Sequence, residues 1–362
     1  MKTIDELSSP AVLIEADALA ANLRRMQSLC AAHDVELWPH IKTHKLVPVL
    51  RRQLAGGAIG ATCAKIGEAE AMLPSGVKRI FIAHSLADLR KAPRLKALQD
   101  RLEQLILAVT SEPQYEALEA VLAEAKIKVP VLMAADTGLD REGARSPAAA
   151  ADLAKKIRSS SRMELIGLYT HEGHAYMNAK SSGDVTRLAK SVLEKLKGCA
   201  RVMGGDLSLW PGCSVTAAAL AQLPGVKAVR PGAYIFGDLY LSEVTKVMSF
   251  EEVALSVLAT VVDRPLSGMA LIDAGSKVFS SDKVDGRLTA RALNPRSLEV
   301  IRLSEEHGFL NGHGVDDLKL GQRLRFQPAH VCPVVNLARE VHLVRGEEVL
   351  ESWPVDARGR SD

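Results

Sequence analysis

Eight short apolar segments recur along the first two thirds of the chain, separated by longer segments with helical periodicity. Such segments are typical of buried strands, and they are Val35–His40, Ile59–Cys63, Arg79–His84, Gln104–Val109, Val129–Ala135, Leu165–His171, Asp206–Trp210 and Val226–Arg230. Between them, residues 88–98, 114–125, 148–158 and 185–202 carry apolar side chains at helical spacing. Eight strand–helix repeats over about 200 residues predict a TIM-like (β/α)8 barrel. An open doubly wound sheet is the alternative.

Two of the helical segments begin with sequence signals for a helix N-terminus. Ser111 precedes Glu112-Pro113, and Ser146 precedes Pro147. A serine hydroxyl there accepts a hydrogen bond from a backbone N–H of the first turn, and proline is tolerated because its missing N–H has no helical partner. Pro93 lies inside segment 88–98 and weighs against a helix that runs unbroken through it.

The pattern changes beyond residue 245. Strand-like segments follow one another there, namely Val253–Val262, Ala270–Asp273, Ser297–Leu303, Gln322–Phe326 and Val334–Val344. No long helical pattern follows, so we expect a C-terminal β-barrel-like domain. The strand-like segment Ala11–Glu15 precedes the barrel and is expected to pair with this domain. The predicted division is residues 18–245 for the barrel, and 1–17 plus 246–362 for the β domain.

Composition narrows the class of protein. The 362 residues have a formal net charge of +3 and 4% aromatic residues, so neither a strong positive field nor base-stacking rings are available for nucleic acid. No apolar segment reaches the roughly 18 residues of a membrane span, and the N-terminus lacks the apolar core of a signal peptide. Five cysteines without a CxxC pair argue against a disulfide framework. We therefore expect a cytoplasmic enzyme that binds neither nucleic acid nor membrane.

Polar residues gather where the predicted strands end, which is where a barrel enzyme builds its active site. Residues 38–45, WPHIKTHK, place His40 and Lys42 at the end of the first strand. A lysine in a barrel mouth is partly desolvated, which lowers the pKa of its amine toward neutrality. Such an amine can form a Schiff base with an aldehyde cofactor. A solvated surface lysine is the alternative.

Two loops after the last two predicted strands have the residues of a phosphate site. They are residues 212–216, GCSVT, and residues 230–234, RPGAY. Backbone N–H groups and hydroxyls bind phosphate in such loops, and barrels often place the phosphate there. Glycine turns are common, however, so neither loop is specific when taken alone.

A His-x-Cys pair, His330 and Cys332, stands near the end of the predicted β domain. On a strand the two side chains would share one face, because side chains alternate with period two. Imidazole and thiolate are both good zinc ligands. A packed histidine and a buried thiol are the alternative interpretation of so short a motif.

The segment PHIKTHK, in a barrel followed by a β domain, resembles the D-threonine aldolase and D-serine dehydratase family. These are pyridoxal-phosphate enzymes of the alanine-racemase-like fold (fold type III), and the resemblance covers essentially the whole chain. It implies that Lys42 carries the cofactor and then removes the α-proton of the substrate, supported by His40 and Thr43. It also implies that Arg141 faces the pyridine nitrogen and, being unable to accept a proton, leaves that nitrogen unprotonated.

Further residues match the pattern of this family. His171 would stack near the cofactor, although a buried structural histidine is an equal alternative, and Tyr176 matches a tyrosine typical of the dehydratase branch. Cys213 replaces a serine that is usual in the phosphate loop. The implied catalytic residues are Lys42, His171 and Tyr176, and the implied cofactor-binding residues are Lys42, His40, Arg141, Tyr176, Ser214, Thr216, Gly232 and Tyr234.

The resemblance also implies that His330 and Cys332 bind a divalent metal beside the cofactor. A His-x-Cys pair resembles the zinc-containing dehydratases, whereas the aldolases look mostly like His-x-Asp with manganese, and magnesium is a further possibility. The segments 273–275, DAG, and 306–308, EHG, match family segments that line the active site, which implies a homodimer with the site near its interface.

The favoured function is therefore a pyridoxal-phosphate- and metal-dependent lyase acting on a small D-3-hydroxy amino acid. A D-serine- or D-threonine-type dehydratase, which forms a 2-oxo acid and ammonia, is preferred because of Cys332 and Tyr176. Aldol cleavage to glycine and an aldehyde is the alternative. A racemase is disfavoured because no tyrosine follows residue 245 to act as a second base. A non-catalytic cofactor carrier is disfavoured because such proteins resemble the barrel alone.

Overall fold

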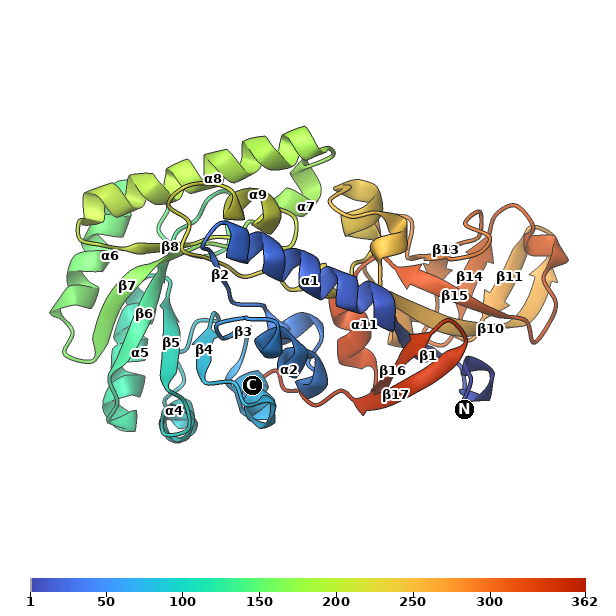
Figure 1. The fold of residues 1–362 in the computed structure, drawn as a ribbon, viewed down its shortest axis with the longest axis horizontal. Coiled ribbons are helices and arrows are strands. Elements are labelled where there is room, and N and C mark those ends of the chain that lie inside the picture. The colour runs from blue at the N-terminus through green and yellow to red at the C-terminus, as the bar shows by residue number, and fades with distance from the viewer. Residues whose placement is uncertain (1) are drawn as a thin grey trace. The chain divides into compact units, whose positions relative to one another are not determined.

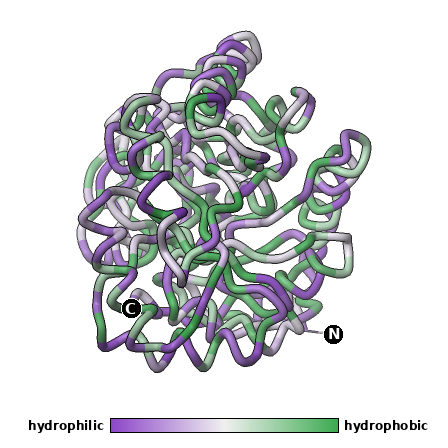
Figure 2. The backbone as a smooth tube through the Cα atoms, turned by 90° about the vertical axis from the view of Figure 1, so that its left-hand side faces the viewer, coloured by the Kyte–Doolittle hydropathy of each residue, from purple (hydrophilic) through white to green (hydrophobic). Residues whose placement is uncertain are grey.

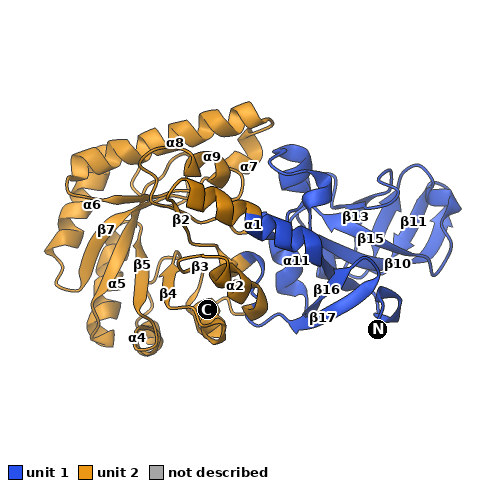
Figure 3. Ribbon diagram, viewed as in Figure 1, with its two compact units in different colours: residues 1–24, 43–46, 233–359 blue, residues 25–42, 47–232, 360–362 orange. Residues whose placement is uncertain are grey.

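The computed structural model describes residues 2–362, and the chain forms two compact units. Unit 1 comprises residues 1–24, 43–46 and 233–359, and unit 2 comprises residues 25–42, 47–232 and 360–362 (Figure 3). Helix α1 (Ala16–Ala32) contributes residues to both units. Each unit has its own sheets, so each is described by itself.

Unit 2 is a parallel barrel. Its strands are β2 (Glu36–Leu37), β3 (Ala61–Cys63), β4 (Arg79–Ile82), β5 (Gln104–Val109), β6 (Val129–Ala134), β7 (Met163–Tyr169), β8 (Ser208–Trp210) and β9 (Ala228–Val229). Strands β3 to β8 form one parallel sheet in chain order, and β2 pairs in parallel with β9 (Figure 1). A bridge between His40 and Thr62 joins β2 to β3, and the N–H of Lys227 donates to the carbonyl of Leu209 over 2.9 Å, joining β9 to β8. The ring therefore closes, which confirms the predicted TIM-like barrel.

Helices follow the strands of this barrel. They are α2 (Val47–Ala55), α3 (Ile66–Met72), α4 (Ala92–Gln99), α5 (Glu112–Ala125), α6 (Pro147–Ser159), α7 (Ala175–Asn178), α8 (Ser182–Met203) and α9 (Ala217–Ala221). Ser111 and Ser146 accept hydrogen bonds from backbone N–H groups in the first turns of α5 and α6, as predicted. The segment around Pro93 differs from the prediction, because a 3-10 turn (Leu89–Lys91) precedes α4 and the proline falls in the first turn of that helix.

Aromatic side chains fill the centre of the barrel. The ring centroids of Trp38 and Trp210 lie 4.7 Å apart, and those of Phe81 and Tyr169 lie 5.1 Å apart with the planes nearly perpendicular. All four side chains are buried. A chain with few aromatic residues thus places four of them in one cluster, which closes the barrel interior and leaves chemistry to the loops at the strand ends.

Unit 1 contains one nine-stranded sheet, of which six strands form an antiparallel barrel and three extend it. Six strands close into a ring in the order β10 (Leu255–Leu266), β11 (Met269–Ile272), β14 (Gly308–Asn311), β13 (Glu299–Leu303), β12 (Ala290–Ala292) and β15 (Arg323–Pro328). Strand β1 (Ala11–Glu15) pairs antiparallel with β10 and parallel with β16 (Glu340–Arg345), which pairs in turn with β17 (Glu348–Pro354). The predicted pairing of Ala11–Glu15 with the C-terminal strands is therefore confirmed.

The prediction of a strand through the His-x-Cys pair is wrong. Strand β15 ends at Pro328, and helix α11 (Val331–Leu337) follows, with His330 as its extended N-cap residue. Strand β16 begins only at Glu340. The reason is Pro333, which cannot donate a hydrogen bond to a strand partner but is tolerated in the first turn of a helix.

The remaining elements are short. They are η1 (Ile4–Glu6), η2 (Ile41–Thr43), η3 (Leu73–Ser75), η4 (Leu89–Lys91), η5 (Ala233–Ile235), the π-helical η6 (Tyr240–Val244), η7 (Phe250–Glu252), η8 (Val315–Asp317) and helix α10 (Ser276–Phe279). Apolar and polar residues are interleaved along the whole chain (Figure 2). Among residues 2–362, no helix combines the length and apolarity needed to cross a membrane.

Candidate active site

Lys42 lies in the tight turn η2, which follows the first barrel strand. The N–H of Lys42 lies 3.4 Å from Nδ1 of His40, and the N–H of His40 donates to the carbonyl of Pro231 over 2.9 Å. The Lys42 side chain is half-buried. The amine thus stands at the carboxyl end of a barrel strand, in the position expected of a lysine that carries a cofactor.

His171 follows strand β7 and lies among cationic groups of the same unit. Burial, and then the charges of Lys42, Arg230 and Arg141, hold the pKa of His171 well below its usual value, so the ring is neutral at neutral pH. Arg141 and His171 line one small pocket together, where Arg141 also pairs with Glu142 at 3.1 Å. The predicted neighbours Lys42, His171 and Arg141 therefore gather at one end of the barrel.

Tyr176 lies beyond this group, in helix α7. The lining of the small pocket includes neither Tyr176 nor Lys42. Tyr234 belongs to unit 1, where it is buried in η5 just after Gly232. The roles predicted for the two tyrosines therefore stay predictions.

The two predicted phosphate loops are joined to each other. The hydroxyl of Ser214 accepts a hydrogen bond from the N–H of Gly232 over 3.1 Å. Gly212 has a φ of +113°, and a Cβ at this position would lie 3.0 Å from the Cβ of Val229. Glycine is therefore required here, both for the left-handed backbone and for the close approach to β9. The two loops therefore lie side by side at the ends of β8 and β9, and their role in binding a phosphate stays a prediction.

Glu172, whose role the sequence did not indicate, holds the first of these loops. Its fully buried carboxylate accepts the N–H of Gly212 at 3.0 and 3.1 Å and the hydroxyl of Thr216 at 3.2 Å. Burial raises the pKa of Glu172, while the hydrogen bond from Gly212 and the charge of Arg230 act in the opposite direction. Thr216, predicted to bind the cofactor, thus donates its hydroxyl to Glu172. The sequence signal that could have indicated Glu172 is its position as a carboxylate directly after an apolar strand.

Glu172→Ala is expected to lower the free energy of unfolding by about 1–3 kcal/mol, because two buried donors lose their acceptor. Glu172→Gln keeps one acceptor oxygen and should cost less. Urea unfolding followed by tryptophan fluorescence measures both variants. Glu194→Ala, on the exposed side of α8, is the matched control, and equal stability of this variant and Glu172→Ala would contradict the assignment.

The predicted metal ligands lie in unit 1, where His330 is the N-cap residue of α11 and Cys332 lies in the first turn of that helix. Burial lowers the pKa of His330, but the charge of Cys332 and a hydrogen bond to Asp282 raise it to about 11. The Sγ of Cys332 also lies 3.1 Å from Oγ1 of Thr43. The helical turn therefore brings the two side chains together without the predicted strand. Among residues 2–362, no cluster of three or more His, Cys, Asp or Glu side chains could hold a metal.

The residues present fit both implied groups. A half-buried amine, a neutral imidazole and a loop with hydroxyl and N–H donors suit pyridoxal phosphate. One imidazole and one thiol suit a zinc-type cation, and a site with only two protein ligands leaves positions open for water or substrate. Open positions are the property of a catalytic rather than a structural metal.

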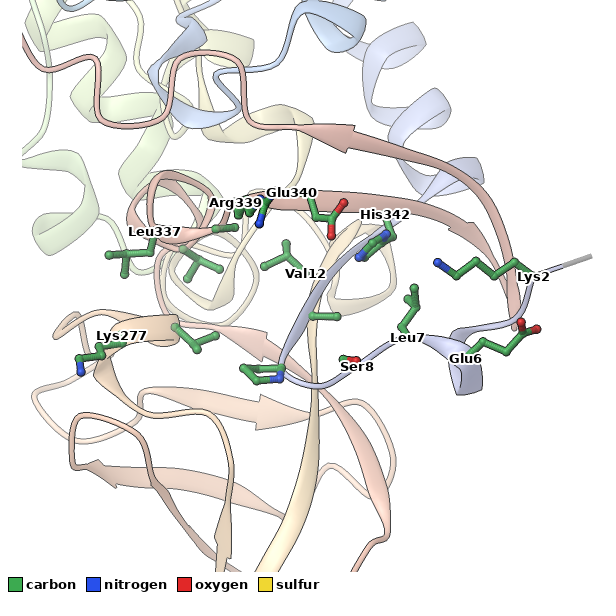
Figure 4. Close-up of a pocket in the computed structure, with 15 residues that line it drawn as sticks. Lys2, Glu6, Leu7, Ser8, Val12, Lys277, Leu337, Arg339, Glu340 and His342 are labelled. Atoms are coloured by element: carbon green, nitrogen blue, oxygen red, sulfur yellow. The ribbon is translucent and has the colours of Figure 1, made fainter.

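A separate cavity of about 420 Å³ lies in unit 1 (Figure 4). Its lining includes Lys2, Val12, Lys277, Glu340 and His342. None of the residues predicted for the cofactor or the metal lines it. The size of this cavity therefore does not identify it as the active site.

Comparison with known proteins decides the family. Residues 14–240 match the family described as "Alanine racemase, N-terminal domain", and residues 254–344 match the "Putative serine dehydratase domain". The chain belongs to the alanine-racemase-like family of D-threonine aldolases and D-serine dehydratases. Membership of this family makes it an enzyme, a lyase of pyridoxal-phosphate fold type III.

Relatives within the D-threonine aldolase and D-serine dehydratase family match over nearly the whole length. The D-threo-3-hydroxyaspartate dehydratase of Delftia sp. is 32% identical, covering 91% of this chain and 92% of the relative. The D-threonine aldolase of Arthrobacter sp. is 28% identical, covering 98% and 94%. The crystal structure of a D-threonine aldolase from Filomicrobium marinum superposes with a TM-score of 0.90 at 25% identity, covering both chains completely.

Two similar solved structures are variants of a D-threo-3-hydroxyaspartate dehydratase. One has a cysteine replaced by alanine and is described as metal-free, with a TM-score of 0.88 at 28% identity, covering 98% of this chain and 99% of that one. The other has a histidine replaced two positions earlier, with a TM-score of 0.89 at 28% identity, covering 98% and 96%. His330 and Cys332 have the same order and spacing in the present member of the family.

Proposed function

We propose that the protein dehydrates a D-3-hydroxy amino acid, forming a 2-oxo acid and ammonia, with pyridoxal phosphate at Lys42 and zinc at His330 and Cys332. The observation that carries this proposal is the contact between the imidazole of His330 and the thiol of Cys332. Sulfur is a ligand for soft or borderline metals such as zinc rather than for manganese or magnesium. The histidine and cysteine exchanged in the solved dehydratase variants support the same pair.

Lys42 has two tasks in this proposal. Bound pyridoxal phosphate supplies an aldehyde that reacts with amines and a conjugated ring that accepts electron density from the α-carbon. Lys42 would hold the cofactor through its amine, and the same amine, when free, would take the α-proton of the substrate onto Nζ. Arg141 would donate a hydrogen bond to the pyridine nitrogen and cannot accept a proton from it. The imidazole of His171 is neutral and adds no further positive charge beside Lys42.

His330 and Cys332 would hold the metal, and the group that leaves is the 3-hydroxyl of the substrate. A bound divalent cation supplies Lewis acidity toward the 3-hydroxyl oxygen. The protein provides one imidazole and one thiolate and leaves the remaining positions to the substrate. Over the whole reaction, water is lost from the substrate and regained on hydrolysis, so D-serine yields pyruvate and ammonia.

Aldol cleavage is the second candidate function, and the near-complete superposition on a D-threonine aldolase favours it. The two reactions use the same lysine, cofactor and metal. They differ in whether the hydroxyl leaves or gives up its proton. Met177 follows Tyr176 at a position where the pattern of the aldolase branch has a histidine, and because a thioether cannot act as a base for that proton, this residue supports dehydration.

Product analysis separates the two reactions. Purified enzyme loaded with pyridoxal phosphate and zinc is incubated with D-serine, D-threonine and D-threo-3-hydroxyaspartate. Dehydration predicts equal amounts of ammonia and a 2-oxo acid, measured by coupled dehydrogenase assays. Glycine with an aldehyde or glyoxylate would instead assign aldol cleavage, and racemised substrate without either product would contradict both.

We also propose that the enzyme acts as a homodimer in the cytoplasm. The five cysteines include no CxxC pair, and four of them are buried, which supports a reducing compartment. Light scattering during size-exclusion chromatography tests the dimer, and a monomer at micromolar concentration would contradict it.

A further inference from the structure

A carboxylate outside the predicted site lies against the imidazole of the metal pair. Oδ2 of Asp282 is 3.4 Å from Nδ1 of His330, and both belong to unit 1. Metal-bound histidines commonly donate the N–H of their second ring nitrogen to a carboxylate, which fixes the tautomer and the ring orientation. A contact at Nδ1 leaves Nε2 as the nitrogen that can bind a metal.

The segment that carries Asp282 is held in place rather than solvated on all sides. The hydroxyl of Ser280 donates to Oδ2 of Asp282 over 3.0 Å, and the N–H of Asp282 returns a hydrogen bond to that hydroxyl over 3.3 Å. Ser280 has a φ of +65°, a backbone conformation that a residue with a side chain rarely adopts. Val284, two residues after Asp282, is buried and packs in an apolar cluster with Leu239 and Ala329.

Tyr240 connects this segment to the imidazole. Its hydroxyl donates to the carbonyl of Lys283 over 2.6 Å. Its ring meets the ring of His330 edge-on, with centroids 6.2 Å apart and planes at 90°. One side chain therefore touches both the metal ligand and the residue after Asp282, so the distance between carboxylate and imidazole is set by packing.

The backbone between the two ligands has an anchor of its own. Asp238 is fully buried, and its carboxylate accepts the N–H of Val331 over 3.2 Å and the N–H of Leu241 over 3.1 Å. Val331 stands between His330 and Cys332. The ring nitrogen, the ring face and the following amide of His330 are thus all fixed by neighbouring residues.

We propose that Asp282 is a positioning residue of the metal site, which orients His330 so that Nε2 faces the metal. Tyr240 keeps the carboxylate in place for this task. The inference rests on the proposed function, because it requires that His330 and Cys332 bind the metal. It adds a residue that lies 48 positions earlier in the chain and that the His-x-Cys motif does not indicate.

The test measures zinc affinity rather than turnover. Purified holoenzyme is stripped of metal with a chelator, and its Kd for zinc is measured by competition with a chromophoric chelator. Asp282→Ala is expected to weaken zinc binding about 10–100-fold. Asp282→Asn keeps an oxygen acceptor but not the charge and should lie between this variant and the wild type. The visible spectrum of the cobalt-substituted protein should also change, because the ring of His330 is no longer fixed.

Asp285→Asn is the matched control, because it removes one negative charge from the same loop. Asparagine also tolerates the left-handed backbone at this position, where φ is +48°. Zinc affinity of this variant should stay within about threefold of the wild type, since no metal ligand loses its partner. Equal losses in Asp285→Asn and Asp282→Asn would assign the effect to general charge and overturn the proposal. Wild-type affinity in both Asp282 variants would overturn it as well.

Two further variants separate this inference from the proposed function. His330→Ala and Cys332→Ala should lose zinc entirely. If they bind zinc as the wild type does, the metal site itself is wrong. If they lose zinc while Asp282→Ala retains wild-type affinity, only the positioning role fails.

Discussion

Lys42→Ala is expected to abolish the visible absorption of the bound cofactor and to lower kcat by at least about 10²–10⁴-fold. The first effect follows because no amine remains at the end of β2 to hold the aldehyde. The second follows because a positioned base contributes rate accelerations of this size. Absorption spectra of the purified variant and turnover of D-serine measure the two effects on one sample.

Lys65→Ala is the matched control for this experiment. Lys65 also lies just past the end of a barrel strand, and burial and the charge of Lys91 lower the pKa of its amine. An amine just past a strand end is therefore found at Lys65 as well as at Lys42. If Lys65→Ala loses the absorption while Lys42→Ala keeps it, the lysine assignment is wrong.

Removal of the metal is expected to lower turnover by about 10³-fold while the cofactor absorption stays. Lewis acidity at the 3-hydroxyl is worth several kcal/mol in the transition state, and each 1.4 kcal/mol is tenfold in rate. Lys42, which is proposed to hold the cofactor, is not one of the two proposed metal ligands, so the cofactor absorption is expected to survive loss of the metal. Chelator treatment followed by addition of zinc should restore the rate.

Cys332→Asp tests the ligand chemistry of the same site. A carboxylate in place of the thiolate favours harder cations, so manganese should restore more activity than zinc after chelation. Cys332→Ala, which supplies no second ligand, should respond to neither metal. Full activity of Cys332→Ala after chelation would show that the pair plays no part in the reaction.

The pattern of short apolar segments predicted the repeating strands of the barrel. Each of the eight barrel strands coincides with an apolar segment, because strands buried on both faces are apolar throughout. Strands β12, with three residues, β14, with four residues, and β17, which is largely exposed, were not predicted because none of them has a sustained apolar pattern. The helix at Cys332 was missed because residues 330–332 were interpreted as a strand. A single i, i+2 spacing cannot distinguish the period of a strand from that of a helix.

The site was predictable to the extent that it lies at strand ends. Lys42, Arg141 and His171 each follow a strand, so the barrel rule alone placed them together. Glu172, Asp238 and Asp282 were not predicted, because their partners lie 40 or more positions away in the chain. The identity of such partners depends on packing rather than on spacing. Two local signals were present, namely the position of Glu172 directly after an apolar strand and the acidic Asp238 within an apolar stretch.

Because the other four cysteines are buried, a thiol reagent should label Cys332, the proposed metal ligand, selectively. Cys30, Cys63, Cys199 and Cys213 are buried, and burial raises the pKa of each thiol, which suppresses alkylation. Cys332 is the half-exposed cysteine of the set. Native protein stripped of metal should therefore take up one equivalent of a maleimide dye, and bound zinc should protect it. That reagent would report metal occupancy as fluorescence on a gel, even in a crude extract.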